Sequence, residues 1–180
     1  MLESYDLKKM GINSADYIHT SAEAIKLAMA DRDTFLGDMD FIRIPYVGLL
    51  SNQYAAARRR LIDPAKASLE FRPGDPAPYT PGFEPVSRPI DVNLSGNADH
   101  EGDTSYIAVV DKERNMISFT PSLHSAFGTK VVMGNLGFIF NCRGDYFSLV
   151  PGHANALEPG KRPRSTLKAR WCSRTASPCW

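Results

Sequence analysis

A long segment with neither helical nor strand pattern divides this 180-residue chain into two unlike parts. Six prolines lie between Arg72 and Pro89, and each proline fixes its backbone φ angle and removes a hydrogen-bond donor. Residues 91 to 103 continue as polar, turn-rich sequence. The composition of the whole segment predicts a linker or a mobile loop. Regular structure is therefore expected before residue 72 and after residue 103.

The part before this segment predicts two helices. Asn13 or Ser14 can cap a helix over residues 12 to 36. Its apolar residues recur at three- and four-residue spacing, at Ala15, Ile18, Ala22, Ile25 and Met29. A second helix is expected from a cap at Ser51 through Leu61 and Ile62, where Asp63-Pro64 stops it.

The part after the segment predicts strands. Residues 105 to 110 are β-branched and apolar, residues 111 to 114 can turn, and residues 115 to 120 alternate again, which is typical of a β-hairpin. A third strand is expected over residues 137 to 141, after the glycine-containing stretch 128 to 134. Helices first and strands second indicate the α+β fold class.

The charge balance argues against nucleic acid or an anionic membrane as a partner. Lys and Arg number 21 and Asp and Glu number 20, so the net charge is +1 and no broad field arises. The dense basic run Arg58-Arg59-Arg60 lies at an expected helix end, which predicts a solvated face with a favourable dipole interaction. No apolar run approaches the ~18 residues of a membrane span. The first twenty residues lack a signal-peptide pattern, so the cellular location stays open.

The sequence predicts neither a metal site nor a bound cofactor. The histidines outside the candidate site have no ligand-like spacing and are interpreted as structural or solvent-facing, namely His19, His100 and His153. The cysteines match no zinc or CxxC pattern, at Cys142, Cys172 and Cys179. Cys142 is expected to pack at a strand end and not to act as a reactive thiol.

Thr104 stands between an acidic, polar segment and the first residue of a predicted strand. A threonine hydroxyl is a poor nucleophile unless a base lies beside it. Its own α-amine, with a pKa of about 7.7 to 8.0, can be that base near neutral pH. Freeing this amine requires cleavage of the peptide bond after Asp103. From spacing alone, an ordinary threonine at a strand start is the simpler interpretation.

The segment around Thr104 resembles the start of the small subunit of γ-glutamyltransferases. Residues 102 to 111 read Gly-Asp-Thr-Ser-Tyr-Ile-Ala-Val-Val-Asp, and a precursor in that family cleaves itself before a threonine in a similar sequence. Further similar motifs follow in the family's order and spacing, at residues 30 to 33, 36 to 41, 122 to 129, 134 to 141 and 159 to 166. The first two resemble the end of the large subunit. The resemblance covers residues 4 to 167.

The resemblance implies an N-terminal-nucleophile hydrolase, whose fold is a four-layer αββα sandwich with strands from both subunits. It also implies a division of this chain into the helical C-terminal part of the large subunit (1–71), the linker to the cleavage site (72–103), the β part of the small subunit (104–167) and an aberrant tail (168–180). The tail departs from the expected family sequence, which predicts a truncated or out-of-frame end.

A mechanism follows from the resemblance. Thr104 attacks the carbonyl carbon of Asp103, and hydrolysis of the resulting ester leaves Thr104 as a new N-terminus. The freed hydroxyl then attacks a γ-glutamyl amide such as glutathione, and the acyl group passes to water or to an amino acid or peptide. The two cleaved pieces are expected to associate with each other.

Three hydroxyl-bearing residues receive roles by position. Ser122 stands where the family has a threonine that hydrogen-bonds the nucleophile, although a strand-end hydroxyl is the alternative. Ser165 and Thr166 match a hydroxyl pair that holds the substrate's α-carboxylate, although they could form an ordinary turn. His124 replaces a family asparagine in the expected substrate site.

The expected substrate site departs from the family at two further positions. Tyr146 aligns with an aspartate that grips the γ-glutamyl α-amine, and Arg143 aligns with an amide or acid. Asp145 lies one position away and could pair with Arg143. Because a phenol carries no charge at neutral pH, it binds an ammonium more weakly than a carboxylate does. An acylase for another amide, such as a glutaryl amide, is therefore the alternative donor class.

Family members are much longer than this chain. An arginine early in the large subunit and a glycine pair that forms the oxyanion hole, whose donors are worth about 2.7 to 4 kcal/mol each, lie outside it. A catalytically inactive family fragment is therefore a further alternative. A chain holding part of each sheet is also expected to expose apolar faces and unpaired edges, and so to depend on a partner or to dissolve poorly.

Overall fold

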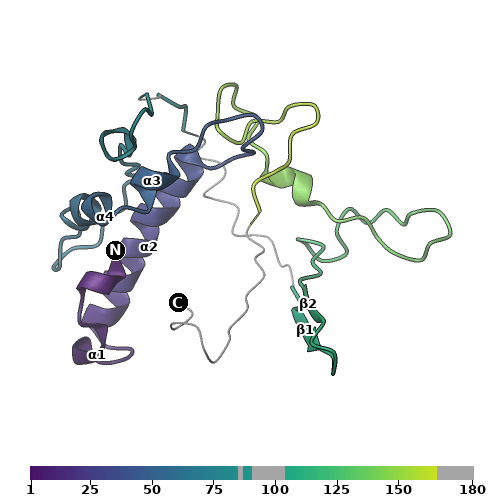
Figure 1. The fold of residues 1–180 in the computed structure, drawn as a ribbon, viewed down its shortest axis with the longest axis horizontal. Coiled ribbons are helices and arrows are strands. Elements are labelled where there is room, and N and C mark those ends of the chain that lie inside the picture. The colour runs from purple at the N-terminus through teal and green to yellow at the C-terminus, as the bar shows by residue number, and fades with distance from the viewer. Residues whose placement is uncertain (85–86, 91–103, 166–180) are drawn as a thin grey trace. The chain divides into compact units, whose positions relative to one another are not determined.

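The structure is a computed structural model and describes residues 1 to 84, 87 to 90 and 104 to 165 (Figure 1). The chain forms two compact units. The first combines Met1–Leu94 with Ser148–Arg162, and the second combines Ser95–Phe147 with Pro163–Trp180. The segment 148–162 therefore packs with the beginning of the chain, although it follows the predicted hairpin in the sequence.

The first unit is helical. Its described helices are η1 (Leu2–Ser4), α1 (Leu7–Met10), α2 (Ala15–Phe35), α3 (Tyr46–Leu49), α4 (Asn52–Arg59) and η2 (Ala77–Tyr79). At the start of α2, the Ser14 hydroxyl accepts a hydrogen bond from the Tyr17 N–H at 3.1 Å, which satisfies a donor that the first turn leaves free. The helix predicted over residues 12 to 36 is confirmed with the bounds Ala15–Phe35, and Ser14, one of the two expected caps, is its N-cap.

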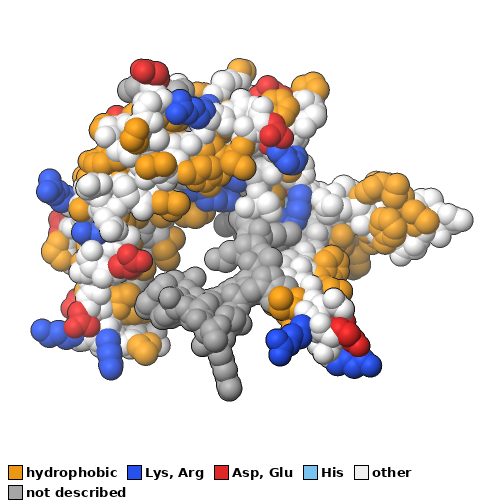
Figure 2. Space-filling view, in the orientation of Figure 1, with side chains coloured by type: hydrophobic (Ala, Val, Ile, Leu, Met, Phe, Trp, Pro, Cys, Tyr) orange, Lys and Arg blue, Asp and Glu red, His pale blue; other side chains and the backbone are white. Residues whose placement is uncertain are grey.

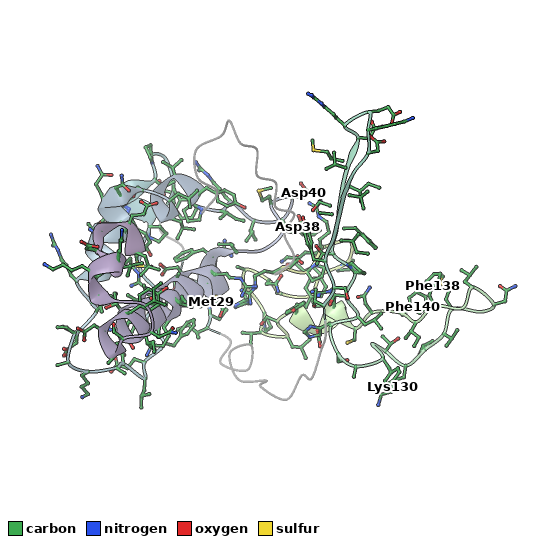
Figure 3. All side chains as sticks on the ribbon, turned by 90° about the horizontal axis from the view of Figure 1, so that it is seen from below. Met29, Asp38, Asp40, Lys130, Phe138 and Phe140 are labelled. Carbon is green, nitrogen blue, oxygen red and sulfur yellow. The ribbon has the colours of Figure 1, made fainter. Side chains whose placement is uncertain are left out.

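The residues whose spacing predicted α2 do not form its buried face. Ile18, Ile25 and Met29 are 55%, 57% and 42% exposed, and Figure 3 labels Met29 on this helix. The buried residues of α2 are Thr20, Glu23, Ala24, Leu27, Ala30, Asp31, Asp33, Thr34 and Phe35. Three of these residues are carboxylates, which a hydrophobic pattern counts as surface positions. Each buried carboxylate has a basic partner, Arg72 for Glu23, Arg58 for Asp31 and Arg32 for Asp33.

Helix α4 begins as predicted and ends earlier. The Ser51 hydroxyl accepts a hydrogen bond from the Tyr54 N–H at 3.1 Å, so the predicted cap is confirmed. The helix stops at Arg59, whereas the prediction extended to Leu61 and Ile62. The N–H groups of these two residues bond to the carbonyl three residues before each, so the chain leaves the helix through tight turns.

Arg58 corrects the predicted solvated basic face. Only 4% of this residue is exposed, and its Nε donates to Asp31 Oδ2 at 3.1 Å while its Nη2 donates to the Leu27 carbonyl at 3.3 Å. The other Asp31 oxygen accepts from the Gly74 N–H at 2.7 Å. Burial raises the pKa of the Asp31 carboxyl, even though Gly74 and Arg58 oppose that rise. Arg58 is buried because it neutralises the Asp31 carboxylate. Arg60 is therefore the one fully exposed arginine of the basic run.

The second unit contains the predicted β-hairpin. Strand β1 (Ile107–Val110) pairs antiparallel with β2 (Met116–Phe119), and Ile107 lies opposite Phe119. The turn is held by Asp111, whose carboxylate accepts from the Asn115 N–H at 2.8 Å. The hairpin is confirmed, and every residue of β1 is exposed.

The predicted third strand over residues 137 to 141 is wrong. Within residues 128 to 141, here called the two-armed loop, one isolated bridge joins Val132 to Ile139. Gly137, the first residue of the predicted strand, has a φ angle of +74°, which lies outside the extended region that a strand requires. Apolar side chains gather at the surface of this loop in Figure 2, and Figure 3 labels Phe138 and Phe140 on it.

The chain is a mixed helix and strand protein. The α-helices lie in the first unit and the hairpin lies in the second, in agreement with the predicted order of elements. In the part of the chain that the structure describes, no helix combines the length and the apolar character that crossing a bilayer requires.

Candidate active site

The hairpin brings the two predicted catalytic hydroxyls together. Thr104 precedes β1 and Ser122 follows β2, and the two residues form an isolated antiparallel bridge. Thr104 Oγ1 lies 3.0 Å from Ser122 Oγ. The pairing of the two strands also fixes the backbone beside them, because the Ser105 N–H donates to the Pro121 carbonyl at 3.2 Å. The Thr104 residue is exposed.

Two donors converge on the Ser122 oxygen. Arg143 Nη2 donates to Ser122 Oγ at 2.7 Å, and the His124 N–H donates to the same oxygen at 3.3 Å. A serine hydroxyl has one proton to donate and two lone pairs with which to accept. With both lone pairs occupied, the Ser122 proton is directed at Thr104 Oγ1.

Arg143 has further hydrogen-bonding capacity. Its Nε and Nη1 atoms are buried and have no hydrogen-bond partner within residues 1–84, 87–90 and 104–165. Its guanidinium carbon lies 5.5 Å from the centre of the Tyr146 ring, a distance at which a cation is attracted to the ring face. Unsatisfied donors of a buried guanidinium suit a planar anion, because a carboxylate accepts two parallel N–H bonds.

The short helix η4 (Arg143–Tyr146) aligns the remaining predicted residues. His124 Nε2 lies 2.9 Å from Asp145 Oδ2, and the His124 ring lies 4.4 Å from the Tyr146 ring, centre to centre. The side chains of His124 and Asp145 are 12% and 37% exposed. The interpretation that Arg143 pairs with Asp145 is therefore wrong: Asp145 pairs with His124, and Arg143 pairs with Ser122.

Cys142 ties η4 to the end of the hairpin. The Cys142 N–H donates to the Leu123 carbonyl at 3.1 Å, and the thiol lies 3.0 Å from the Ser125 hydroxyl. These contacts give Cys142 a packing role, although no strand ends there. His124, between Leu123 and Ser125, has a φ angle of +78°, a conformation that His and Asn adopt more readily than most residues.

The other predicted residues lie elsewhere or outside the description. Ser165 is exposed and takes no part in the hydrogen bonds that join Thr104, Ser122 and Arg143. Asp103, Thr166, His100, Cys172 and Cys179 lie outside the described residues. His19 contacts the Asp63 carbonyl at 2.8 Å, and His153 is buried. Among the residues that the structure describes, no group of three His, Cys, Asp or Glu side chains could hold a metal ion.

The sequence singled out Thr104, Ser122, His124, Arg143, Asp145 and Tyr146, which the structure brings together, but it did not predict the contacts between them. The bond between Arg143 and Ser122 joins residues 21 positions apart, and no spacing rule predicts it. The contact of Cys142 with Leu123 at the hairpin end likewise comes from the return of the two-armed loop.

Comparisons with known proteins identify relatives over nearly the whole chain. Residues 1–174 match the family model described as Gamma-glutamyltranspeptidase. The chain is 37% identical over 179 residues to the Glutathione hydrolase proenzyme of Escherichia coli (strain K12). This alignment covers 93% of this chain and 27% of that protein. It is 33% identical over 162 residues to the Acylase ACY 1 proenzyme of Pseudomonas sp. (strain SE83), covering 90% of this chain and 25% of that protein.

A solved structure supports the same relationship. The crystal structure of cephalosporin acylase from Bacillus halodurans matches with a TM-score of 0.63 at 30% sequence identity, covering 86% of this chain and 24% of that one. The chain thus spans about a quarter of the length of the relatives that it matches.

Proposed function

Because this chain belongs to the gamma-glutamyltranspeptidase family, we propose that it is part of an N-terminal-nucleophile amidohydrolase that cleaves itself before Thr104. The relatives from Escherichia coli and Pseudomonas are both named proenzymes, which supports a cleavage step. In this proposal the whole protein has the four-layer αββα fold. Residues 1 to 71 belong to its large subunit, residues 72 to 103 to the linker, residues 104 to 167 to its small subunit, and residues 168 to 180 to an aberrant tail.

The observation that carries the proposal is the hydrogen-bonded chain from Arg143 through Ser122 to Thr104. With its two lone pairs occupied by Arg143 and His124, Ser122 would donate to Thr104 Oγ1 and so leave the Thr104 proton free to move to a base. In the uncut chain, Thr104 Oγ1 forms a bond to the Asp103 carbonyl carbon, and the C–N bond to Thr104 breaks as its nitrogen takes up the proton. Water then hydrolyses the ester, which releases the Asp103 carboxylate and restores the hydroxyl.

The mature Thr104 would use the same atoms on a substrate. Its new α-amine accepts the hydroxyl proton, Oγ1 attacks the amide carbon, and the amine returns the proton to the leaving nitrogen. Water or an amino acid or peptide amine then takes the acyl group from the ester. We propose γ-glutamyl amides such as glutathione as donors, since relatives are named glutathione hydrolase. Ser165 and Thr166 would hold the donor's α-carboxylate, with His124 and Asp145 beside it.

Mass spectrometry of the purified chain tests the first step. Cleavage before Thr104 leaves pieces of 103 and 77 residues. We expect these pieces from the native sequence and an intact chain from Thr104→Ala. Ser105→Ala is the matched control, because it removes the neighbouring hydroxyl and leaves the nucleophile in place. A native chain that stays whole would overturn the proposal for this chain and favour an inactive family fragment.

A specific observation favours a second donor class. Two buried donors of Arg143 have no partner among the described residues, Tyr146 offers a phenol in place of a carboxylate, and the Asp145 carboxylate is paired with His124. This arrangement favours the carboxylate of an acyl chain over an ammonium group, as in a glutaryl amide. The acylase names of one relative and of the solved structure support the same class.

Rates on γ-glutamyl anilide and glutaryl anilide separate the two donor classes. If Arg143 holds a glutaryl carboxylate, Arg143→Gln lowers the ratio of glutaryl to γ-glutamyl turnover about tenfold to a hundredfold, because a hydrogen bond to a charged group contributes about 1.5 to 3 kcal/mol. Arg114→Gln, in the hairpin turn, is the control and keeps the native rate. A preference for γ-glutamyl anilide that Arg143→Gln leaves unchanged would reject the second class.

A further inference from the structure

The segment 148–162, here called the docking loop, folds on itself around buried polar groups. The Ser148 N–H donates to the Asn155 carbonyl at 2.9 Å, and the Leu157 N–H donates to the Ser148 carbonyl at 3.0 Å. Asn155 and Ala154 are completely buried and Ser148 is 1% exposed. The centre of this loop is therefore covered by the unit to which it belongs, which is formed by the beginning of the chain.

Gly37, which follows α2, allows the close approach of the docking loop. A Cβ atom on Gly37 would lie 2.2 Å from the Ala154 carbonyl oxygen, closer than any side-chain carbon can come to a backbone atom. Position 37 therefore requires glycine, because any side chain there would collide with the Ala154 carbonyl. Residues separated by more than a hundred positions form this interface.

Charge pairing closes the end of the docking loop. The Arg162 backbone N–H and Nε both donate to Asp38 Oδ2, at 2.8 and 2.9 Å, and Nη2 donates to Asp38 Oδ1 at 2.5 Å. Nη2 also reaches Asp40 Oδ2 at 2.6 Å. The Asp38 side chain is 2% exposed, and the hydrogen bonds from Arg162 hold the pKa of its carboxyl well below the usual range. Figure 3 shows Asp38 and Asp40 close together in the loop after α2.

Lys161 adds a second basic contact beside this pair. Its ammonium lies 5.5 Å from the centre of the Phe41 ring and 2.7 Å from Glu158 Oε1, and its side chain is completely buried. The acidic turn at residues 38 to 41 thus receives two consecutive basic side chains from the docking loop.

We propose that the docking loop is the attachment that holds the piece starting at Thr104 on the piece ending at Asp103 after the chain is cut, with the Asp38–Arg162 ion pair as its anchoring contact. This inference rests on the proposed cleavage before Thr104. Asp38, Asp40 and Gly37 lie in the first piece, and Arg162 and Ala154 lie in the second. Cleavage would turn these contacts from packing within one chain into an interface between two.

The test cuts the chain without relying on self-cleavage. In the Thr104→Ala background, residues 95 to 101 are replaced by the recognition sequence of a site-specific protease, and the cut protein is passed over a size-exclusion column at decreasing concentrations. We expect the two pieces to elute together. Arg162→Glu is expected to raise their dissociation constant about tenfold or more, because it replaces an attraction with a repulsion beside a buried carboxylate. Asp38→Asn, which keeps the shape of the side chain, is expected to act in the same direction.

Lys112→Glu is the matched control, since it makes the same charge change in the same piece at a side chain that is 88% exposed. It should leave the dissociation constant unchanged. Circular dichroism before cutting checks that each variant retains α2. Pieces that separate at once, or that associate equally well in Arg162→Glu and Lys112→Glu, would overturn the inference. Failure of the native chain to cut itself would count against the proposed function and leave this result unaffected.

Discussion

At the scale of single residues, the Ser122 hydroxyl determines how Thr104 is presented. It accepts hydrogen bonds from Arg143 Nη2 and the His124 N–H and lies 3.0 Å from Thr104 Oγ1. We expect Ser122→Ala to slow self-cleavage about tenfold to a hundredfold, because it removes a charge-assisted contact and leaves another buried Arg143 donor unsatisfied. Ser122→Thr keeps the hydroxyl and should cleave nearly as fast as the native chain. The fraction of cut chain against time, measured by mass spectrometry, gives the rates.

Ser118→Ala is the control for this effect. Ser118 lies on the same hairpin and its hydroxyl contacts the Tyr106 hydroxyl at 3.0 Å, so the variant loses an equal group away from Thr104. Equal rates for Ser118→Ala and Ser122→Ala would show that the Ser122 contact has no special role.

The sequence could identify Thr104 and Ser122 through a family resemblance. It could not identify the hydrogen bond between Arg143 and Ser122, because the folding of the chain, and no local sequence pattern, brings these two residues together.

At the scale of elements, the Asp31–Arg58 pair joins α2 to α4. Both side chains are more than nine-tenths buried, so Arg58→Met would leave the Asp31 carboxylate buried without its cation. We expect this variant to lower the free energy of unfolding by about 3 to 5 kcal/mol. Urea unfolding followed by the helical circular dichroism signal measures it. Arg60→Met removes an exposed arginine from the same run and should change stability by less than about 0.5 kcal/mol. Similar losses in the two variants would contradict the pairing.

The elements that the sequence predicted correctly are those that local contacts determine. Ser14 and Ser51 cap their helices within three residues, and the Asp111 carboxylate closes the hairpin turn over four. The strand predicted over residues 137 to 141 is wrong because the segment pairs through one isolated bridge and its first residue, Gly137, has a positive φ angle that a hydrophobic count does not register. Arg58 was assigned to the surface because its partner lies 27 residues away. Local chemistry therefore specifies where elements begin, and distant pairing decides which of their faces is buried.

At the scale of the whole molecule, exposed apolar surface dominates the second unit. The hairpin is a single two-stranded sheet, which is marginally stable by itself, and Ile107 and Val109 are 48% and 50% exposed. On the two-armed loop, Phe138 and Phe140 are 52% and 41% exposed, and both are labelled in Figure 3. Contiguous apolar patches of this kind mark surfaces that associate with another protein surface.

We expect the chain to self-associate as its concentration rises, which sedimentation velocity would detect as a shift to faster species. The double variant Phe138→Ser, Phe140→Ser should weaken that association about tenfold, because two aromatic side chains no longer contribute apolar area. Leu69→Ser is the control: Leu69 is completely exposed, but a single exposed apolar side chain does not create an interface. A chain that stays monomeric throughout and melts in one sharp, reversible transition would contradict this account, since the exposed strands would then need no partner.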